Sequence, residues 1–115
     1  MVSGDEVRRF LNNFKVKMSI WEVVFRNDRQ KNVDALLSME IKPNDRKKIL
    51  EELQVQDYSQ GPIIDTLHKG TDMWVFGKKV KGHEIYIKIT MGIPQSGVIC
   101  ISFHKAEHPM KYPLK

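Results

Sequence analysis

The chain has 115 residues, of which 41% are hydrophobic; this length suits one domain over residues 1–115, and no stretch approaches the ~18 apolar residues of a membrane span. The N-terminus lacks the basic and then apolar segments of a signal peptide, and the single cysteine cannot form an internal disulfide, so a cytoplasmic protein is expected. The net charge of +5 comes from the last 48 residues, which hold 8 Lys and 3 Asp or Glu; this balance indicates either an anionic partner (RNA, DNA or an acidic protein segment) or simply solubility.

The first 25 residues contain a helix signal followed by a strand signal. Ser3 and Glu6 have the spacing of a capping box. Four apolar residues then follow at helical spacing: Val7, Phe10, Leu11 and Phe14. Together these features predict a helix over residues 5–13. Residues 15–25 alternate between apolar and polar with one slip in phase, which predicts a strand that is bulged or buried on both faces.

Two further helices are expected in the middle of the chain. Asn32 can cap a short helix, and Pro43 suits the first turn of the next one. The residues of this next helix that would face the core are Ile49, Leu50 and Leu53. Residues 57–62 then break the pattern with Gly and Pro. This segment is either a simple stop after the helix or an active-site loop.

Beyond residue 70 the hydrophobic period changes to two. Three strands are predicted, over residues 73–76, 84–90 and 98–104, with a turn at residues 77–82 between the first two. Helices in the first half followed by neighbouring strands in the second half are typical of an α+β protein. We therefore predict N-terminal helices packed on an antiparallel β-meander.

The last two strands each carry a polar row on one face. In residues 85–90 isoleucine takes every odd position and points to the core, so the even positions face the other way. In residues 99–104 the apolar residues also take the odd positions, so Cys100 is expected outside with the other even positions. If the two strands pair as a hairpin, the two polar rows are neighbours. The residues that would share this face are Tyr86, Lys88, Ser102 and His104.

This set of side chains suits cleavage of a phosphodiester. The imidazole of His104 can carry a proton in either direction near neutral pH. Lys88 can neutralise charge that develops on a phosphate, and the Tyr86 phenol can donate a hydrogen bond or stack on a base. No carboxylates with metal-ligand spacing accompany them, so no metal and no other cofactor is expected. A solvated face of an ordinary antiparallel sheet would show the same residue types.

His104 and His108, with Glu107 between them, match the spacing of an inverted zinc-protease motif. That motif needs a helix, because only a helix brings residues four apart onto one face. His104 instead ends a β-rich segment, and Pro109 directly follows His108. The context therefore argues against zinc and leaves His108 in a turn.

Several short motifs in this order resemble the MqsR-type toxins of bacterial type II toxin–antitoxin systems. They are Leu53 with Asp57-Tyr58, Trp74 at the start of a strand, Gly82 at a turn, the segment 86–89 (Tyr-Ile-Lys-Ile) and the segment 102–104 (Ser-Phe-His). The resemblance covers roughly residues 10–104. It implies a RelE-like α+β fold, mRNA cleavage without metal through attack of the ribose 2′-hydroxyl, and neutralisation by a cognate antitoxin protein.

The resemblance also places the functional residues of the family on this chain. The catalytic tyrosine falls on Tyr86. The lysine that follows the Ser-Phe pair falls on His104, and the lysine in the loop after the Asp-aromatic pair falls near Gln60. The glutamine that follows the tryptophan falls on Val75, which cannot replace it. One functional residue of the four is therefore retained by type, and His104 is a plausible replacement for a lysine.

The sequence thus predicts a ribonuclease toxin with Tyr86, Lys88 and His104 as catalytic residues. Five further residues are predicted to contact RNA: Lys78, Lys79, Lys81, Gln60 and Ser102. The three lysines among them could follow a phosphate backbone or simply form a solvated turn. The alternative function is a non-catalytic module whose basic sheet face binds RNA or an acidic protein.

Overall fold

The computed structural model describes residues 2–26, 30–38, 40–67 and 69–115. Within these ranges the helices are α1 (Gly4–Ile20), α2 (Gln30–Ser38) and α3 (Asp45–Glu51), followed by the short 3₁₀ turn η1 (Val55–Asp57). The strands are β1 (Val24–Phe25), β2 (Tyr58–Ile63), β3 (Met73–Val80), β4 (His83–Thr90) and β5 (Ile99–Lys105).

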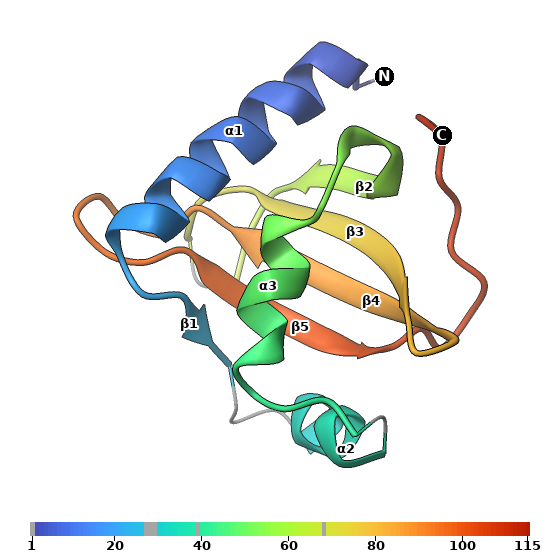
Figure 1. Ribbon diagram of the computed structural model, residues 1–115. Coiled ribbons are helices and arrows are strands. Elements are labelled where there is room, and N and C mark those ends of the chain that lie inside the picture. Colours follow the sequence, from blue (N-terminus) through green and yellow to red (C-terminus); the bar gives the residue numbers. More distant parts are fainter. Residues whose placement is uncertain (1, 27–29, 39, 68) are drawn as a thin grey trace.

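The strands form one sheet in the order β1-β5-β4-β3-β2. Strands β2 to β5 are an antiparallel meander, and β1 adds to β5 in parallel. Helices α1 and α3 lie across one face of the sheet, which we call the inner face, and α2 lies beside the β5 edge (Figure 1). The predicted α+β class is confirmed, and the arrangement is consistent with the expected RelE-like architecture.

Helix α1 is longer than the sequence pattern predicted. It does not end near residue 13 but continues to Ile20, so the predicted strand over residues 15–25 is wrong except for the two residues of β1. Met18 explains the difference, because it lies four residues after Phe14 and is buried in the same apolar stripe. Ile20, which strand alternation would have buried, is 67% exposed.

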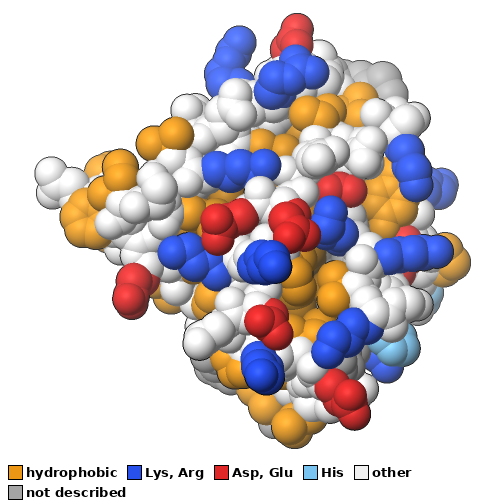
Figure 2. All heavy atoms as spheres, in the orientation of Figure 1, with side chains coloured by type: hydrophobic (Ala, Val, Ile, Leu, Met, Phe, Trp, Pro, Cys, Tyr) orange, Lys and Arg blue, Asp and Glu red, His pale blue; other side chains and the backbone are white. Residues whose placement is uncertain are grey.

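The hydrophobic core lies between α1, α3 and the inner face of the sheet. Phe10 of α1 stacks on Trp74 of β3 with their ring centroids 4.6 Å apart. The isoleucines of β4 are fully buried in this core, as predicted: Ile85, Ile87 and Ile89. On the solvent-exposed surface of the helical side of the molecule, Lys and Arg side chains are interspersed with Asp and Glu (Figure 2). The helical side therefore does not present a surface of one charge sign.

The two expected middle helices are present as α2 and α3, with small differences at their starts. Asn32 lies inside α2 instead of capping it, and Pro43 lies in the turn that precedes α3. The three residues of this region that were predicted to face the core, Ile49, Leu50 and Leu53, are buried. In the described part of the chain, no helix combines the length and the apolar character needed to cross a bilayer.

Two segments that were predicted as breaks or turns are mostly strand. The first of them, residues 57–62, largely forms the edge strand β2, where the cis Gly61–Pro62 bond and an irregular register occur. An edge position suits a proline, since the backbone on one side of an edge strand has no neighbouring strand to pair with. Strand β3 runs through most of the predicted turn at 77–82 and leaves only Lys81 and Gly82, with φ of 51° and 80°. Two positive φ values are typical of a two-residue hairpin turn.

Strand β5 contains a bulge that changes which of its residues face the core. Its register with β4 shifts between Cys100 and Ser102, which leaves Ile101 as the extra residue. Cys100 therefore turns into the core, where it is 1% exposed, and its predicted outward position is wrong. Ile99 and Ile101, predicted inside, line the outer face of the sheet instead. Beyond the bulge, Phe103 keeps the inward position that the alternation predicted.

Asn32 of α2 holds this bulge in place from the side. Its Nδ2 donates to the carbonyl oxygens of Arg26 at 2.9 Å and Ile101 at 3.0 Å, and its Oδ1 accepts from the backbone N–H of Phe103 at 3.0 Å. The Asn32 side chain is therefore bonded to β5 where β1 has already ended. Because Asn32 is only 3% exposed, its buried side chain is satisfied by these backbone groups and not by water.

Candidate active site

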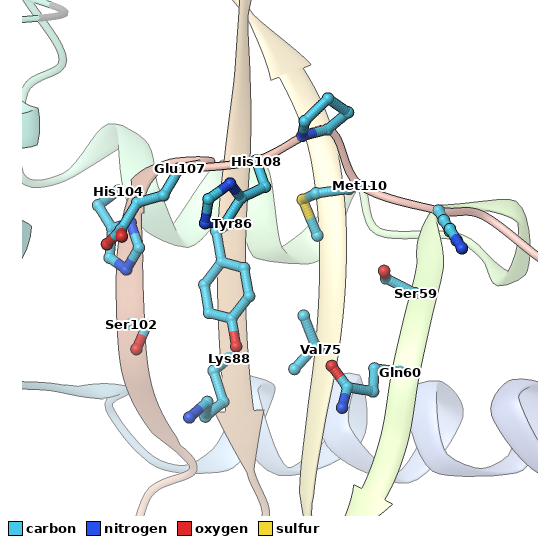
Figure 3. Close-up of a pocket in the computed structure, with 12 residues that line it drawn as sticks. Ser59, Gln60, Val75, Tyr86, Lys88, Ser102, His104, Glu107, His108 and Met110 are labelled. Atoms are coloured by element: carbon cyan, nitrogen blue, oxygen red, sulfur yellow. The ribbon is translucent and has the colours of Figure 1, made fainter.

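The face of the sheet opposite the helices, which we call the outer face, contains a pocket of about 590 Å³. Its strand-borne lining includes Gln60, Val75, Tyr86, Lys88, Ser102 and His104 (Figure 3). The chain that follows β5 supplies a second group of lining residues between Glu107 and Lys111. The pocket is therefore built by four strands and closed along one side by the C-terminal segment.

The four residues that were predicted to share a face do so. Tyr86 and His104 lie opposite each other on β4 and β5, and their rings stack with centroids 5.2 Å apart and 14° between the planes. Lys88 and Ser102 form the next pair along the same two strands. In Figure 3 the Tyr86 hydroxyl points along β4 toward Lys88. The arrangement brings an imidazole, a phenol and an ammonium group to one pocket.

The hydrogen bond of His104 indicates which of its ring nitrogens can act as a base. Nδ1 lies 2.9 Å from the backbone carbonyl oxygen of Lys105. A carbonyl oxygen can only accept, so in this bond Nδ1 carries the proton. In the neutral ring the lone pair that can take a proton is then on Nε2. The backbone of β5 thus holds the neutral His104 ring in the tautomer whose Nε2 is unprotonated.

Four residues form a row across the outer face, one from each strand of the meander. Gln60 of β2 lies opposite Val75 of β3, Val75 lies opposite Lys88 of β4, and Lys88 lies opposite Ser102 of β5. Val75 is buried at 1% exposure, so it forms an apolar floor between the amide and the ammonium group. The amide of Gln60 therefore stands beside the position where the resemblance implies a glutamine.

Glu84 ties the C-terminal segment to the sheet. Its backbone carbonyl oxygen accepts from Ala106 N at 2.9 Å, and its carboxylate accepts from Met110 N at 3.1 Å and from the Tyr112 hydroxyl at 2.7 Å. These bonds span residues 106–112. We call this segment the strap, because it crosses the start of β4 and borders the pocket (Figure 3).

Gly77 makes room for the strap on β3. A Cβ at this position would overlap the Tyr112 hydroxyl and lie 2.8 Å from Met110 Sδ. Burial, followed by the hydrogen bond to Glu84, raises the pKa of Tyr112 above the usual tyrosine range. The phenol therefore stays protonated and continues to donate to Glu84 over the whole physiological pH range.

The strap contributes residues that the sequence analysis did not assign to the site. His108, Met110 and Lys111 line the pocket with His104, although the sequence placed His108 in a turn apart from the strands. The one signal was the spacing of His104 and His108, which was considered only as a zinc motif. Long-range bonds to Glu84 create this proximity, and no local pattern shows such bonds.

The three lysines predicted to bind RNA lie outside the pocket. Lys78 is 3.6 Å from the Asp57 carboxylate, and Lys81 Nζ donates to the Glu40 carbonyl oxygen at 2.7 Å. Lys79 is exposed and lines a smaller hollow that also includes Tyr112. Gln60 and Ser102 are the two predicted RNA-contacting residues that the structure brings to the pocket.

Two other reactive centres can be assessed from the geometry. No group of three or more His, Cys, Asp or Glu side chains among the described residues is placed to hold a metal ion. Complete burial raises the pKa of the Cys100 thiol to about 12. A thiol that stays protonated and inaccessible does not act as a nucleophile.

A second hollow of about 640 Å³ adjoins the pocket on the outer face. Its lining includes Ile99, Ile101 and Met73, and it shares Lys88 with the pocket. The two hollows therefore meet at one positive charge. An extended, negatively charged ligand could pass Lys88 and occupy both.

No protein-family model, no curated protein and no solved structure matches this chain.

Proposed function

We propose that this chain is the toxin of a bacterial type II toxin–antitoxin system and cleaves mRNA in the cytoplasm as a metal-independent endoribonuclease. Its partners would be the mRNA substrate and a cognate antitoxin protein. The observation that supports the proposal is the meeting of Tyr86, Lys88 and His104 in one pocket on the open face of the sheet. The sequence resemblance supports the same reaction, because Tyr86 and the segment 102–104 are among its marks.

The proposed reaction is an internal transfer at the phosphate of RNA. The 2′-oxygen of the ribose bonds to the adjacent phosphorus while the bond from phosphorus to the 5′-oxygen of the next nucleotide breaks. His104 takes the proton of the 2′-hydroxyl on Nε2. Lys88 stabilises the negative charge on the non-bridging oxygens, and the Tyr86 hydroxyl donates a hydrogen bond to one of them.

Gln60 supplies the pocket with an amide group that supports the proposed function. The resemblance implies an amide at position 75, where this chain has valine, and a lysine near position 60. Gln60 and Val75 are partners on neighbouring strands, so an amide reaches the same row of the pocket from the adjacent strand. We assign Gln60 to binding of the phosphate or sugar beside the cleaved bond, whereas Ser102, which is 1% exposed, forms part of the pocket wall opposite Lys88.

The proposal is tested with purified protein and a pool of single-stranded RNA. His104→Ala is expected to lower the cleavage rate by ~10²–10⁴-fold, because such factors are typical for loss of a general base. Tyr86→Phe keeps the ring on His104 but removes the hydroxyl, and we expect a loss of ~10²–10³-fold. His83→Ala is the matched control, since His83 begins β4 opposite Val80, away from the pocket.

Three results would contradict parts of the proposal. Cleavage by His104→Ala at the wild-type rate would remove this residue from the mechanism. Cleavage that stops when a chelator is added would refute the metal-independent reaction. RNA binding by the wild-type protein without any fragments would favour the non-catalytic binding module. In cells, relief of growth arrest by His104→Ala but not by His83→Ala is the corresponding expectation.

A further inference from the structure

The proposed reaction needs two proton transfers, and His104 accounts for one of them. A base removes the proton of the 2′-hydroxyl, and an acid must protonate the 5′-oxygen as it leaves. An alkoxide is a poor leaving group in water, so the second transfer is as important as the first. The pocket contains a second imidazole, that of His108 on the strap.

We propose that His108 is the general acid of the site and protonates the leaving 5′-oxygen. This inference rests on the proposed ribonuclease function and extends it to a residue outside the sheet. His104 and His108 come from different parts of the fold, one from β5 and one from the strap, yet both line the same pocket. In Figure 3 both imidazoles lie on the side of the pocket next to the strap, with the Tyr86 ring beside them and Lys88 farther along β4.

The strap holds His108 in this place from both sides. On the N-terminal side, Ala106 N is bonded to the Glu84 carbonyl oxygen, and on the C-terminal side, Met110 N is bonded to the Glu84 carboxylate. Only three residues lie between these two anchors, and His108 is the middle one. The bend between the anchors thus places its imidazole at the start of β4, beside Tyr86 (Figure 3).

Other ionisable side chains at the pocket are less suited to this transfer. Those that line it besides the two histidines are Tyr86, Lys88, Glu107 and Lys111. Among side-chain types, a carboxyl group is ordinarily ionised near neutral pH, and a lysine ammonium or a tyrosine phenol ordinarily keeps its proton. Imidazole is the type that both holds and releases a proton in this range. Lys88, Lys111 and Glu107 are the charged side chains that line the pocket together with His108.

The proton balance of the step closes with the two histidines. Neutral His104 gains the 2′-proton as the new oxygen–phosphorus bond forms, and cationic His108 loses its proton to the 5′-oxygen as the old bond breaks. The products are a 2′,3′-cyclic phosphate and a free 5′-hydroxyl. The reaction leaves His104 protonated and His108 neutral, and exchange with water restores both.

A substrate that needs no acid separates this role from a merely structural one. Uridine 3′-(4-nitrophenyl phosphate) releases nitrophenolate, which leaves without a proton. His108→Ala is expected to lower RNA cleavage by ~10²–10⁴-fold but to lower release of nitrophenolate by less than about 10-fold. His104→Ala should lower both rates, because both substrates need the base. His83→Ala again serves as the control.

The pH dependence provides a second measurement. For wild-type protein acting on RNA, the rate should fall at low pH as His104 becomes protonated and at high pH as His108 loses its proton. His108→Ala should retain the fall at low pH and lose the fall at high pH. Gly77→Ala displaces the strap through Tyr112 and Met110 without touching either imidazole, and it should reproduce the selective loss on RNA.

The outcomes distinguish this inference from the function on which it rests. Equal losses on both substrates in His108→Ala, or wild-type rates on both, would overturn the role of His108 while leaving that of His104. Failure of the wild-type protein to cleave either substrate would overturn the proposed function and this inference with it. Circular dichroism of each variant, matched to wild type, verifies that the fold is intact.

Discussion

The inner and outer faces of the sheet are built by the same strands and differ in what covers them. On the inner face α1 and α3 enclose alternate residues of β4 such as Ile87, which is fully buried. On the outer face the intervening residues Tyr86 and Lys88 border a pocket that the strap closes along one side. Residues of the core and residues of the pocket are therefore separated here by one position along the chain, because the side chains of a strand alternate between its two faces.

The largest difference between the faces should appear in the free energy of unfolding. Phe14 is fully buried under the helices, so Phe14→Ala should destabilise the protein by about 3–5 kcal/mol. His104→Ala on the outer face loses a ring stack, worth at most about 1.5 kcal/mol. Urea denaturation with a comparison of midpoints measures both changes. Equal destabilisation by the two variants would mean that the faces are not divided in this way.

Substitution of Asn32 tests whether its hydrogen bonds hold the β5 bulge, which determines the residues that point to each face. The expected effect on stability is smaller than that of Phe14→Ala. Asn32→Ala leaves the buried N–H of Phe103 and the carbonyl oxygen of Ile101 without their partner, which should cost about 2–3 kcal/mol. Because the bulge also sets the position of His104, the proposed RNA cleavage should fall as well. Asn12→Ala on the exposed side of α1 is the matched control and should change stability by less than about 0.5 kcal/mol. Equal stabilities of the two variants would show that the bulge holds without Asn32.

The smallest effect concerns the strap and its dependence on pH. The pKa of Tyr112 is raised in the folded protein. The Tyr112 hydroxyl therefore contributes fully to the free energy of unfolding below the pH at which a free tyrosine ionises, about 10. This contribution is lost as the pH rises through the pKa of the folded state. Tyr112→Phe removes one hydrogen bond and should cost about 1 kcal/mol. In a titration followed by tyrosinate absorbance, this variant should lack the component that ionises at the highest pH. If that component instead disappears in Tyr86→Phe, the assignment to Tyr112 is wrong.

The sequence predicted those parts of the molecule that local patterns determine. Ser3 accepts from the backbone N–H of Glu6 at the start of α1, as their spacing indicated. The alternation in β4 correctly gave its buried isoleucines, and the turn residue Gly82 marked the β3–β4 hairpin. Tyr86 and His104 were placed on one face because only a period of two and hairpin pairing were needed. These inferences depend on neighbours in the chain or on adjacent strands.

The parts that the sequence did not predict depend on contacts between distant residues. The bulge that turns Cys100 inward is stabilised by Asn32, which lies 69 residues before Ile101. The strap is held at the pocket by its hydrogen bonds to Glu84. Gly77 falls in the turn that the sequence predicts, and only its contact with Tyr112 explains why a glycine is needed there. The extension of α1 is a different case, since Met18 fits both a strand and a helix pattern and only packing decides between them.

The side chain of Asn32 has a consequence for how molecules of this protein meet one another. Strand β1 covers only the first residues of β5, so the rest of β5 would be an open edge able to pair with a strand of another molecule. Asn32 engages the carbonyl oxygen of Ile101 and the N–H of Phe103 and thereby occupies the groups that such a strand would need. A single amide thus makes these two backbone groups at the edge of β5 unavailable to a strand of another molecule.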